Sequence, residues 1–160
     1  NTLPCDGEAF GELKVRGPWV SRGYFRDESS ETVDSEGWFA TGDVATIDGD
    51  GYMHITDRIK DLIKSGGEWI SSIALENLAM SHPDVMQAAV IGIPDDKWTE
   101  RPLLIVKAKA GANPSKEDLL GFFKGKVEDW SIPDDVMMVE ELPIGGTGKV
   151  QKSELRKTYG

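Results

Sequence analysis

Apolar and polar side chains alternate in the first part of the chain, which predicts β-strands. Residues 12–16 alternate one by one, a pattern typical of a half-buried strand. Residues 39–47 and 52–56 predict two more strands, because the Asp and Gly residues between them, 48–51, tolerate the positive φ of a hairpin turn. The first segment is therefore expected to be rich in β-structure.

The second part of the chain predicts helices that alternate with strands. Three apolar runs predict strands, at residues 85–93, 103–110 and 136–139, the first of them ended by Pro94. Three helices are predicted. The first follows the candidate N-caps Ser71 and Ser72 and ends at Pro83, and its apolar face is formed by Leu75, Leu78 and Ala79. The second follows Ser115, where Asp118 replaces the Glu of a capping box, and its apolar stripe is formed by Leu119, Phe122, Phe123 and Val127; the third lies at residues 152–159. The predicted fold class is α+β, with a small three-stranded sheet flanked by helices behind the β-rich segment.

Composition and charge narrow the class of protein. The 160 residues are 39% hydrophobic and 29% charged, so a packed core is expected rather than disorder. The formal net charge of -10 argues against nucleic acid or an anionic membrane as the main partner. Residues 1–57 hold 4 basic and 12 acidic side chains, whereas residues 58–160 hold 14 and 16. This change predicts a domain boundary nearby, with one domain at 1–59 and a second at 60–160.

Cysteine and histidine content indicates the compartment. Cys5 is the only cysteine, so no disulfide can form within the chain, and together with His54 and His82 it cannot build a structural zinc cluster. We therefore predict no metal site and a reducing, cytoplasmic location. No apolar run approaches the length of a membrane span. The first residues contain neither an initiator Met nor a signal peptide, so the chain is expected to be a fragment.

Three stretches could carry chemistry, and each also has a plain structural interpretation. Asp43, in Thr-Gly-Asp, could accept hydrogen bonds from a ribose diol or be an ordinary turn residue. The second stretch is DRIKDLIKSGG at residues 57–67, in which the cations Arg58, Lys60 and Lys64 precede Gly66 and Gly67. This arrangement suits a phosphate site, or a solvated strand followed by a glycine turn.

The third stretch is Gly-Gly-Thr-Gly-Lys, and it ends at Lys149. A glycine-rich loop could move this lysine onto a phosphate, or the lysine could simply be solvated on a surface loop. The spacing is not that of a P-loop, because Val150 follows the lysine where Ser or Thr is required. Trp98 and Trp130 flank predicted loops, where each could stack on an adenine or pack at the rim of the core.

In this order and spacing the three stretches resemble the adenylate-forming (AMP-binding) superfamily, which includes acyl-CoA synthetases, adenylation domains and firefly luciferase. The resemblance runs from Gly11 to Arg156. It is closest to the medium-chain fatty-acyl-CoA synthetases and methylmercaptopropionate-CoA ligases, which share the run IKSGGEWISS at residues 63–72. The resemblance implies the end of a large N-terminal domain at 1–59 and a mobile C-terminal lid domain at 60–160.

The resemblance also implies roles for individual residues. Asp43 corresponds to the aspartate that binds the ribose hydroxyls of ATP or AMP, and Arg58 to the arginine at the ribose and phosphates. Lys60 corresponds to the hinge. Lys149 corresponds to the catalytic lysine that contacts the substrate carboxylate and the α-phosphate.

A second group is implied to bind CoA. Gly66, Gly67 and Glu68 correspond to the loop along the pantetheine tunnel, and Trp98 and Trp130 to aromatics against the CoA nucleotide. An arginine that a relative carries near Ile132 is absent here.

The implied activity is an acid–thiol ligase reaction. A carboxylic acid, expected to be a fatty acid, would be activated by ATP as an acyl-adenylate, and the acyl group would then pass to CoA. Mg²⁺ would be held mainly by phosphates and by residues outside this chain. The fragment alone is expected to be inactive, and any homo-oligomer is expected to form through the N-terminal domain. The alternative is a truncated, non-catalytic module for nucleotide binding or protein interaction.

Overall fold

The computed structural model describes residues 2–21 and 33–160, and the chain divides into two compact units, Asn1–Lys60 and Asp61–Gly160. The division falls one residue after the boundary predicted from composition. The place of each unit in a longer enzyme, and the mobility of the second unit, stay predictions.

The first unit contains an antiparallel sheet of three strands in the order β1-β2-β3. The strands are β1 (Phe10–Val15), β2 (Phe39–Ile47) and β3 (Met53–Arg58), close to the predicted ranges. The predicted hairpin turn joins β2 to β3: the Asp48 carboxylate accepts hydrogen bonds from the Asp50 and Tyr52 amides, and Gly51 has a φ of 85°. Asp48 therefore fixes the turn, and the turn fixes which residues of β2 and β3 face each other.

The second unit contains a sheet of five strands, two more than predicted. The three predicted strands are β6 (Val85–Asp95), β7 (Thr99–Ala108) and β8 (Asp135–Met138). β7 pairs antiparallel with β6 and parallel with β8, and one end of it pairs with β4 (Ile63–Ser65), which forms a hairpin with β5 (Glu68–Ile70). The sequence prediction missed β4 and β5 because three residues are too few to show a period of two.

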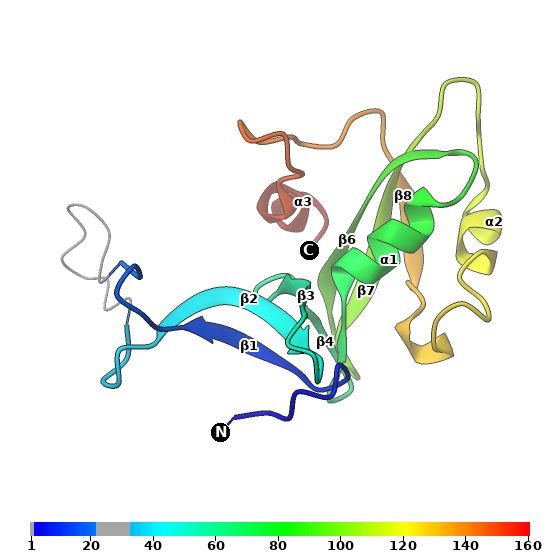
Figure 1. The fold of residues 1–160 in the computed structure, drawn as a ribbon. Helices are drawn as coiled ribbons and strands as arrows, with labels where there is room; N and C mark the ends of the chain where they lie inside the picture. Colours follow the sequence, from blue (N-terminus) through cyan, green and yellow to red (C-terminus); the bar gives the residue numbers. More distant parts are fainter. Residues whose placement is uncertain (1, 22–32) are drawn as a thin grey trace. The chain divides into compact units, whose positions relative to one another are not determined.

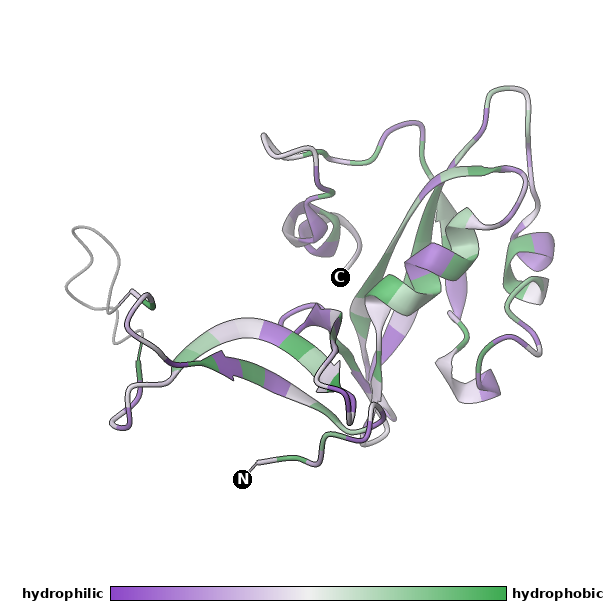
Figure 2. Cartoon of the chain, viewed as in Figure 1, coloured by the Kyte–Doolittle hydropathy of each residue, from purple (hydrophilic) through white to green (hydrophobic). Residues whose placement is uncertain are grey.

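The helices of the second unit cover both faces of this sheet (Figure 1). α1 (Ser72–Met80) and α2 (Lys116–Gly121) pack on one face, and α3 (Lys152–Tyr159) packs on the other. Neighbouring residues of β6 alternate between the two cores, with Val90 in one and Ile91 in the other. Figure 2 shows β6 as largely hydrophobic and α3 as largely hydrophilic. The α+β class is thus as predicted, with a sheet buried on both sides.

The helix starts follow the predicted capping residues, with one correction. Ser71 is the N-cap of α1, since its Oγ accepts the Ala74 amide at 3.2 Å. Ser115 caps α2 in the same way through the Asp118 amide. The Asp118 carboxylate accepts the Ser115 hydroxyl at 2.7 Å instead of closing a capping box, because Asp is one methylene shorter than Glu. α2 ends at Gly121, so the predicted stripe continues past the helix, with Phe123 buried in the core.

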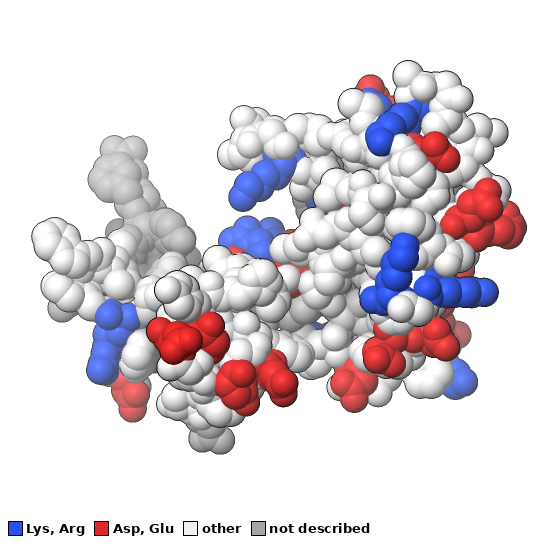
Figure 3. All heavy atoms as spheres, turned by 45° about the vertical axis from the view of Figure 1, so that its right-hand side comes forward, with Lys and Arg blue, Asp and Glu red and all other residues white. Residues whose placement is uncertain are grey.

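β6 runs through Pro94, which was predicted to end it. Proline is tolerated here because, in the part of the chain that the structure describes, β6 pairs only with β7 and its other edge carries no strand. Among the described residues, no helix has the length and apolar character needed to cross a membrane. On the face drawn in Figure 3, acidic and basic side chains form small groups, and several groups of opposite charge adjoin one another.

Candidate functional site

Asp43 and Arg58 lie directly opposite each other on β2 and β3. Arg58 Nε donates to Asp43 Oδ1 at 3.2 Å, and the side chains are 53% and 27% exposed. Asp43 Oδ2 has no hydrogen-bond partner among the described residues. Because a carboxylate can accept at both oxygens, Asp43 can keep Arg58 and still accept hydroxyl hydrogen bonds from a ligand.

The backbone around Asp43 is held from both sides. Thr41 Oγ1 donates to the Leu13 carbonyl at 2.9 Å and accepts the Asp43 amide at 3.1 Å. Gly42 has a φ of 76°, which other residues rarely adopt, and its carbonyl accepts the Ile59 amide at 2.9 Å. The Thr-Gly-Asp stretch is therefore built into the sheet as more than an ordinary turn.

Gly42, Arg58, Ile59 and Lys60 line a depression in the first unit. Lys60 is exposed, and the residues on either side of it are tied to different units. Ile59 is bonded to Gly42 as described, whereas Asp61 accepts Arg156 Nη2 of α3 at 2.8 Å. The sequence thus passes from one compact unit to the other at Lys60.

Gly66 and Gly67 form the turn of the β4–β5 hairpin, with φ values of 61° and 91°. This pair of positive φ values is the reason two glycines are needed. A Cβ atom on Gly66 would lie 2.8 Å from Trp98 Cε3, so the indole packs against the turn. The Gly66 amide donates to the Trp98 carbonyl at 2.8 Å. Glu68 follows the turn and is exposed.

Trp98 sits in the turn between β6 and β7. The Asp95 carboxylate accepts the Lys97 and Trp98 amides at 2.9 and 2.8 Å, and Lys97 Nζ lies 4.4 Å from the centroid of the Trp98 ring. Thr99, next in the chain, has a φ of 75°, a strained value for a β-branched residue. Trp98 is 42% exposed, so part of the indole stays accessible to solvent.

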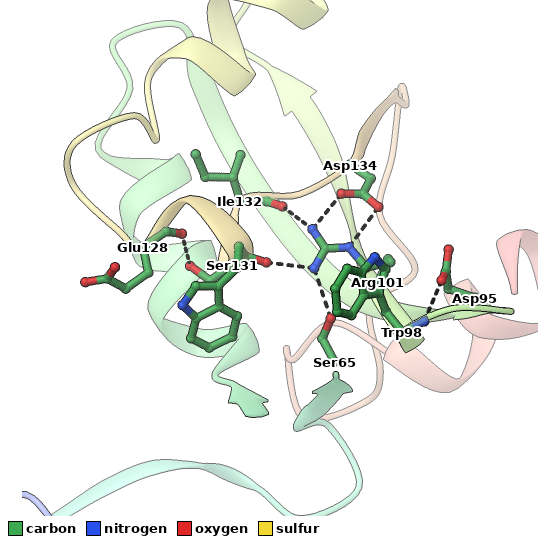
Figure 4. A network of polar contacts seen from close by, with 9 residues as sticks. Ser65, Asp95, Trp98, Arg101, Glu128, Ser131, Ile132 and Asp134 are labelled. Atoms are coloured by element: carbon green, nitrogen blue, oxygen red, sulfur yellow. Dashed lines mark hydrogen bonds and ion pairs between the residues drawn. The ribbon is translucent and has the colours of Figure 1, made fainter. Parts of the chain in front are cut away.

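Sequence analysis missed Arg101, which organises this part of the second unit (Figure 4). The side chain is 11% exposed and makes five hydrogen bonds: Nε and Nη2 to Asp134, Nη1 to Ser65 Oγ and the Trp130 carbonyl, and Nη2 to the Ile132 carbonyl. The hydrogen bond to Asp134 raises the pKa of Arg101. An arginine beside a run of buried apolar residues was the available signal, because a buried cation requires acceptors.

Trp130 belongs to the same hydrogen-bond network, because its backbone carbonyl accepts from Arg101. It lies in η1 (Asp129–Ser131), a short 3-10 helix where a loop was predicted, and its indole is 44% exposed. Ser131 is buried and donates to the Glu128 carbonyl at 2.8 Å, which closes the turn. Ile132 offers its carbonyl to Arg101, so this position contributes through its backbone.

Lys149 ends a tight loop with a defined backbone. The Gly145 amide donates to the Lys149 carbonyl at 2.8 Å and the Gly148 amide to the Gly145 carbonyl at 2.9 Å. Gly148 has a φ of 77°, which the turn requires. The Lys149 side chain is exposed and has no ion pair or hydrogen bond in the described part of the chain. It therefore presents an unneutralised ammonium on a fixed loop.

α3 anchors this loop from its far end. Lys152 Nζ lies 2.7 Å from Glu76 Oε1 and donates to Ser72 Oγ at 2.6 Å, and both charged side chains are largely buried. Glu76 Oε1 also accepts the amide of Val90 in β6 at 2.8 Å. The start of α3 is therefore joined to α1 and to the edge of the sheet, three residues after Lys149.

The structure divides the predicted site residues among three places. Asp43, Arg58 and Lys60 belong to the first unit. Gly66, Gly67, Glu68, Trp98 and Trp130 are connected through Ser65 and Arg101 in the second unit. Lys149 lies on its own loop. Lys64, a further predicted cation, lies over the Trp69 ring with Nζ at 5.2 Å from the centroid.

Comparison with known proteins gives a family match that lies within the second unit. Residues 74–149 match the family described as the AMP-binding enzyme C-terminal domain. Relatives match over nearly the whole chain. The 3-methylmercaptopropionyl-CoA ligase of Ruegeria pomeroyi is 55% identical over 159 residues, and the medium-chain-fatty-acid–CoA ligase of Ectopseudomonas oleovorans is 51% identical over 158. Each match covers 99% of this chain but 29% of the relative.

Solved structures agree with this assignment of an AMP-binding C-terminal domain. The crystal structure of ATP-bound MatB from Rhodopseudomonas palustris matches with a TM-score of 0.89 at 34% identity, over 98% of this chain and 31% of that one. The resemblance to adenylate-forming enzymes, and in particular to the two ligase groups named from sequence, is confirmed. The chain spans about 29% of the length of these curated relatives.

Proposed function

We propose that this chain is the C-terminal part of an AMP-forming acyl-CoA synthetase. The enzyme activates a carboxylic acid with ATP as an acyl-adenylate and transfers the acyl group to CoA. The observation that carries the proposal is the 55% identity to a 3-methylmercaptopropionyl-CoA ligase, because it extends over both compact units. Relatives named for medium-chain and long-chain fatty acids support a fatty acid or a similar acid as substrate.

In the first step a carboxylate oxygen attacks the α-phosphorus of ATP. The new O–P bond forms as the bond to pyrophosphate breaks, and pyrophosphate leaves with its electron pair. Asp43 would accept the ribose hydroxyls through Oδ2 while Arg58 stays on Oδ1 and faces the phosphates. Lys149 would neutralise the charge that develops at the α-phosphate, a role that suits an exposed ammonium on an ordered loop.

In the second step the CoA thiolate attacks the acyl carbonyl. The C–S bond forms, the C–O bond to AMP breaks, and AMP leaves. Gly66, Gly67 and Glu68 would line the path of the pantetheine arm, because a turn without side chains lets a narrow chain pass closely. The half-exposed faces of Trp98 and Trp130 would cover the nucleotide end of CoA.

One domain would serve both steps by turning about Lys60. The backbone bond of Ile59 within the first unit and the ion pair of Asp61 within the second support this role, since Lys60 alone lies between them. MatB supports mobility in a relative: its ATP-bound and apo structures match this chain over the same share with TM-scores of 0.89 and 0.67. The two MatB structures therefore differ in the matched region.

The remaining parts of the proposal concern metal, partners and location. The described residues contain no group of three His, Cys, Asp or Glu side chains able to hold a metal. We propose that Mg²⁺ is held mainly by the nucleotide phosphates and by residues outside this chain. We propose the acid, ATP and CoA as partners and the cytoplasm as location. Inactivity of this chain alone and an oligomer formed through an N-terminal domain stay predictions.

Lys149→Ala in the full-length enzyme tests the proposal. We expect adenylation, measured as pyrophosphate exchange with a panel of acids, to fall by about 10²–10³, the usual effect of removing one preorganised charge. Thioester formation from synthetic acyl-adenylate and CoA should change less than about threefold, because Lys149 acts only in the first step.

The matched control is Lys124→Ala, which removes another exposed lysine of the same unit and should leave both steps unchanged. Wild-type enzyme that exchanges no pyrophosphate with any acid would contradict the proposed function. Equal losses in both steps would show that Lys149 supports structure instead.

A further inference from the structure

We propose that Arg101 is a positioning residue for the surface that takes CoA: it holds the Gly66–Gly67 turn, Trp98 and Trp130 as one unit. The inference rests on the proposed function for the identity of the ligand. Arg101 itself is buried under this surface and is not expected to touch CoA.

The hydrogen bonds of Arg101 leave no donor unused. A guanidinium has five N–H groups, and the structure gives each one an acceptor at 2.6 to 3.2 Å. Three of the acceptors lie in two segments that are far apart in sequence. Ser65 Oγ lies in β4, and the carbonyls of Trp130 and Ile132 lie in and directly after η1. The planar fork therefore fixes the distance between β4 and the η1 segment.

Two of the acceptors, Ser65 Oγ and the Trp130 carbonyl, adjoin or belong to residues of the proposed CoA surface. Ser65 immediately precedes the glycine turn, and the turn is bonded to Trp98 through the Gly66 amide. The Trp130 carbonyl is part of the second tryptophan. A shift of the guanidinium would thus move the turn, Trp98 and Trp130 relative to one another.

Asp134 completes the arrangement by orienting the guanidinium. It accepts from Nε and Nη2 at 2.8 and 2.6 Å, a bidentate geometry that sets the plane of the fork. Asp134 is 51% exposed, so water can solvate it when Arg101 is removed. The consequence of losing Arg101 is then mainly loss of order in the segments it joins, instead of an unpaired buried charge.

The Lys149 loop does not share these contacts. Its backbone bonds are internal, and its anchor is the pair of Lys152 and Glu76. Among the described residues, none of the acceptors of Arg101 lies in this loop. Loss of Arg101 should therefore affect the second step of the reaction and spare the first.

The first experiment measures amide hydrogen exchange in this 160-residue chain with Arg101→Met. We expect exchange at Gly66 to accelerate at least tenfold and exchange at Gly148, in the Lys149 loop, to stay within twofold of wild type. Unchanged exchange at Gly66 would overturn the proposal. This measurement does not depend on enzymatic activity, so it judges Arg101 even where the proposed function fails.

The second experiment measures the two half-reactions in the full-length enzyme. Arg101→Met should raise KM for CoA or lower the thioester rate at least tenfold while pyrophosphate exchange stays within threefold. Arg101→Lys should give an intermediate loss, because an ammonium keeps the charge but cannot reach all five acceptors. Equal losses in both half-reactions, or full activity in Arg101→Lys, would overturn the proposal.

The matched control is Lys107→Met. Lys107 lies on the same strand, β7, and is also partly buried in an ion pair, with Nζ 2.8 Å from Glu141 Oε1. Its one ion pair in the described residues is with Glu141, away in sequence from every residue of the proposed CoA surface, so both half-reactions should remain unchanged. A CoA-specific loss in Lys107→Met would mean that any damage to β7 has this effect, and it would overturn the specific role of Arg101.

Discussion

Gly66 and Gly67 are adjacent residues with different structural requirements. Both have positive φ, so any side chain strains the backbone at either position. Only Gly66 is also covered: its Cβ would lie 2.8 Å from Trp98 Cε3, whereas a Cβ on Gly67 would meet nothing within 4 Å. The pair thus separates backbone strain from steric conflict with the indole.

We predict that Gly67→Ala destabilises the second unit by about 1 kcal/mol, the typical cost of an L-residue in this conformation. Gly66→Ala should cost clearly more and should change the fluorescence of Trp98. The measurement is the free energy of unfolding from amide exchange in the core strands, which reports this unit alone. Equal costs would show that Trp98 moves away without penalty.

At this scale the sequence indicated candidate residues but not their contacts. Glycines close to lysines predicted the two loops, because glycine tolerates the positive φ of a turn and lets the backbone approach a ligand. Nothing local indicated that Trp98 packs against Gly66, or that Arg101 reaches Ser65, since these contacts join residues 32 and 36 positions apart. Asp43 was ambiguous from sequence, and its pairing with Arg58 depends on the strand register.

At the scale of the elements, β6 lies at an edge of the sheet, and side chains from two helices meet at the unpaired edge of its backbone. The Glu76 carboxylate of α1 accepts the Val90 amide, and Lys152 of α3 reaches the same oxygen. An edge strand with an unpaired amide would be a site for pairing with another chain. The ion pair therefore holds two helices together and also closes part of this edge.

We predict that Lys152→Met destabilises the second unit by about 3 kcal/mol, because it leaves the carboxylate of Glu76 largely buried without its cation. Lys157→Met is the matched control in the same helix. Its ion pair with Glu154 is exposed and should contribute less than about 0.5 kcal/mol. Urea unfolding followed by amide exchange would measure both. Similar losses in the two variants would contradict the role given to the buried pair.

The longer elements were predictable because their periodicity was long enough to recognise. The β6, β7 and β8 strands, α1 and α3 lie within a few residues of the predicted ranges, and α2 begins where predicted but ends before its apolar stripe does. β4 and β5 were not predicted, although they carry the glycine turn. Their strand conformation comes from pairing with each other and with β7, which is a tertiary effect.

At the scale of the whole molecule, the two units meet in sequence at a single exposed residue. Most of the net negative charge lies before the point where the chain divides into its two compact units. The reason for the position of this division was not visible, because it depends on two contacts made by the neighbours of Lys60. Ile59 is bonded to Gly42 in the first unit, and Asp61 is paired with Arg156 in the second.

We predict that Lys60→Pro in the full-length enzyme retains adenylation and loses thioester synthesis. Proline fixes φ near −65°, so a residue whose torsions must change between the two steps can serve only the compatible one. Lys60→Ala is the matched control: it removes the same side chain but keeps the backbone free, and both steps should stay within about twofold of wild type. The measurement compares pyrophosphate exchange with CoA-dependent AMP release. A Lys60→Pro enzyme with normal overall turnover would show that the chain bends elsewhere. Loss of thioester synthesis in Lys60→Ala as well would assign the effect to the side chain and not to the hinge.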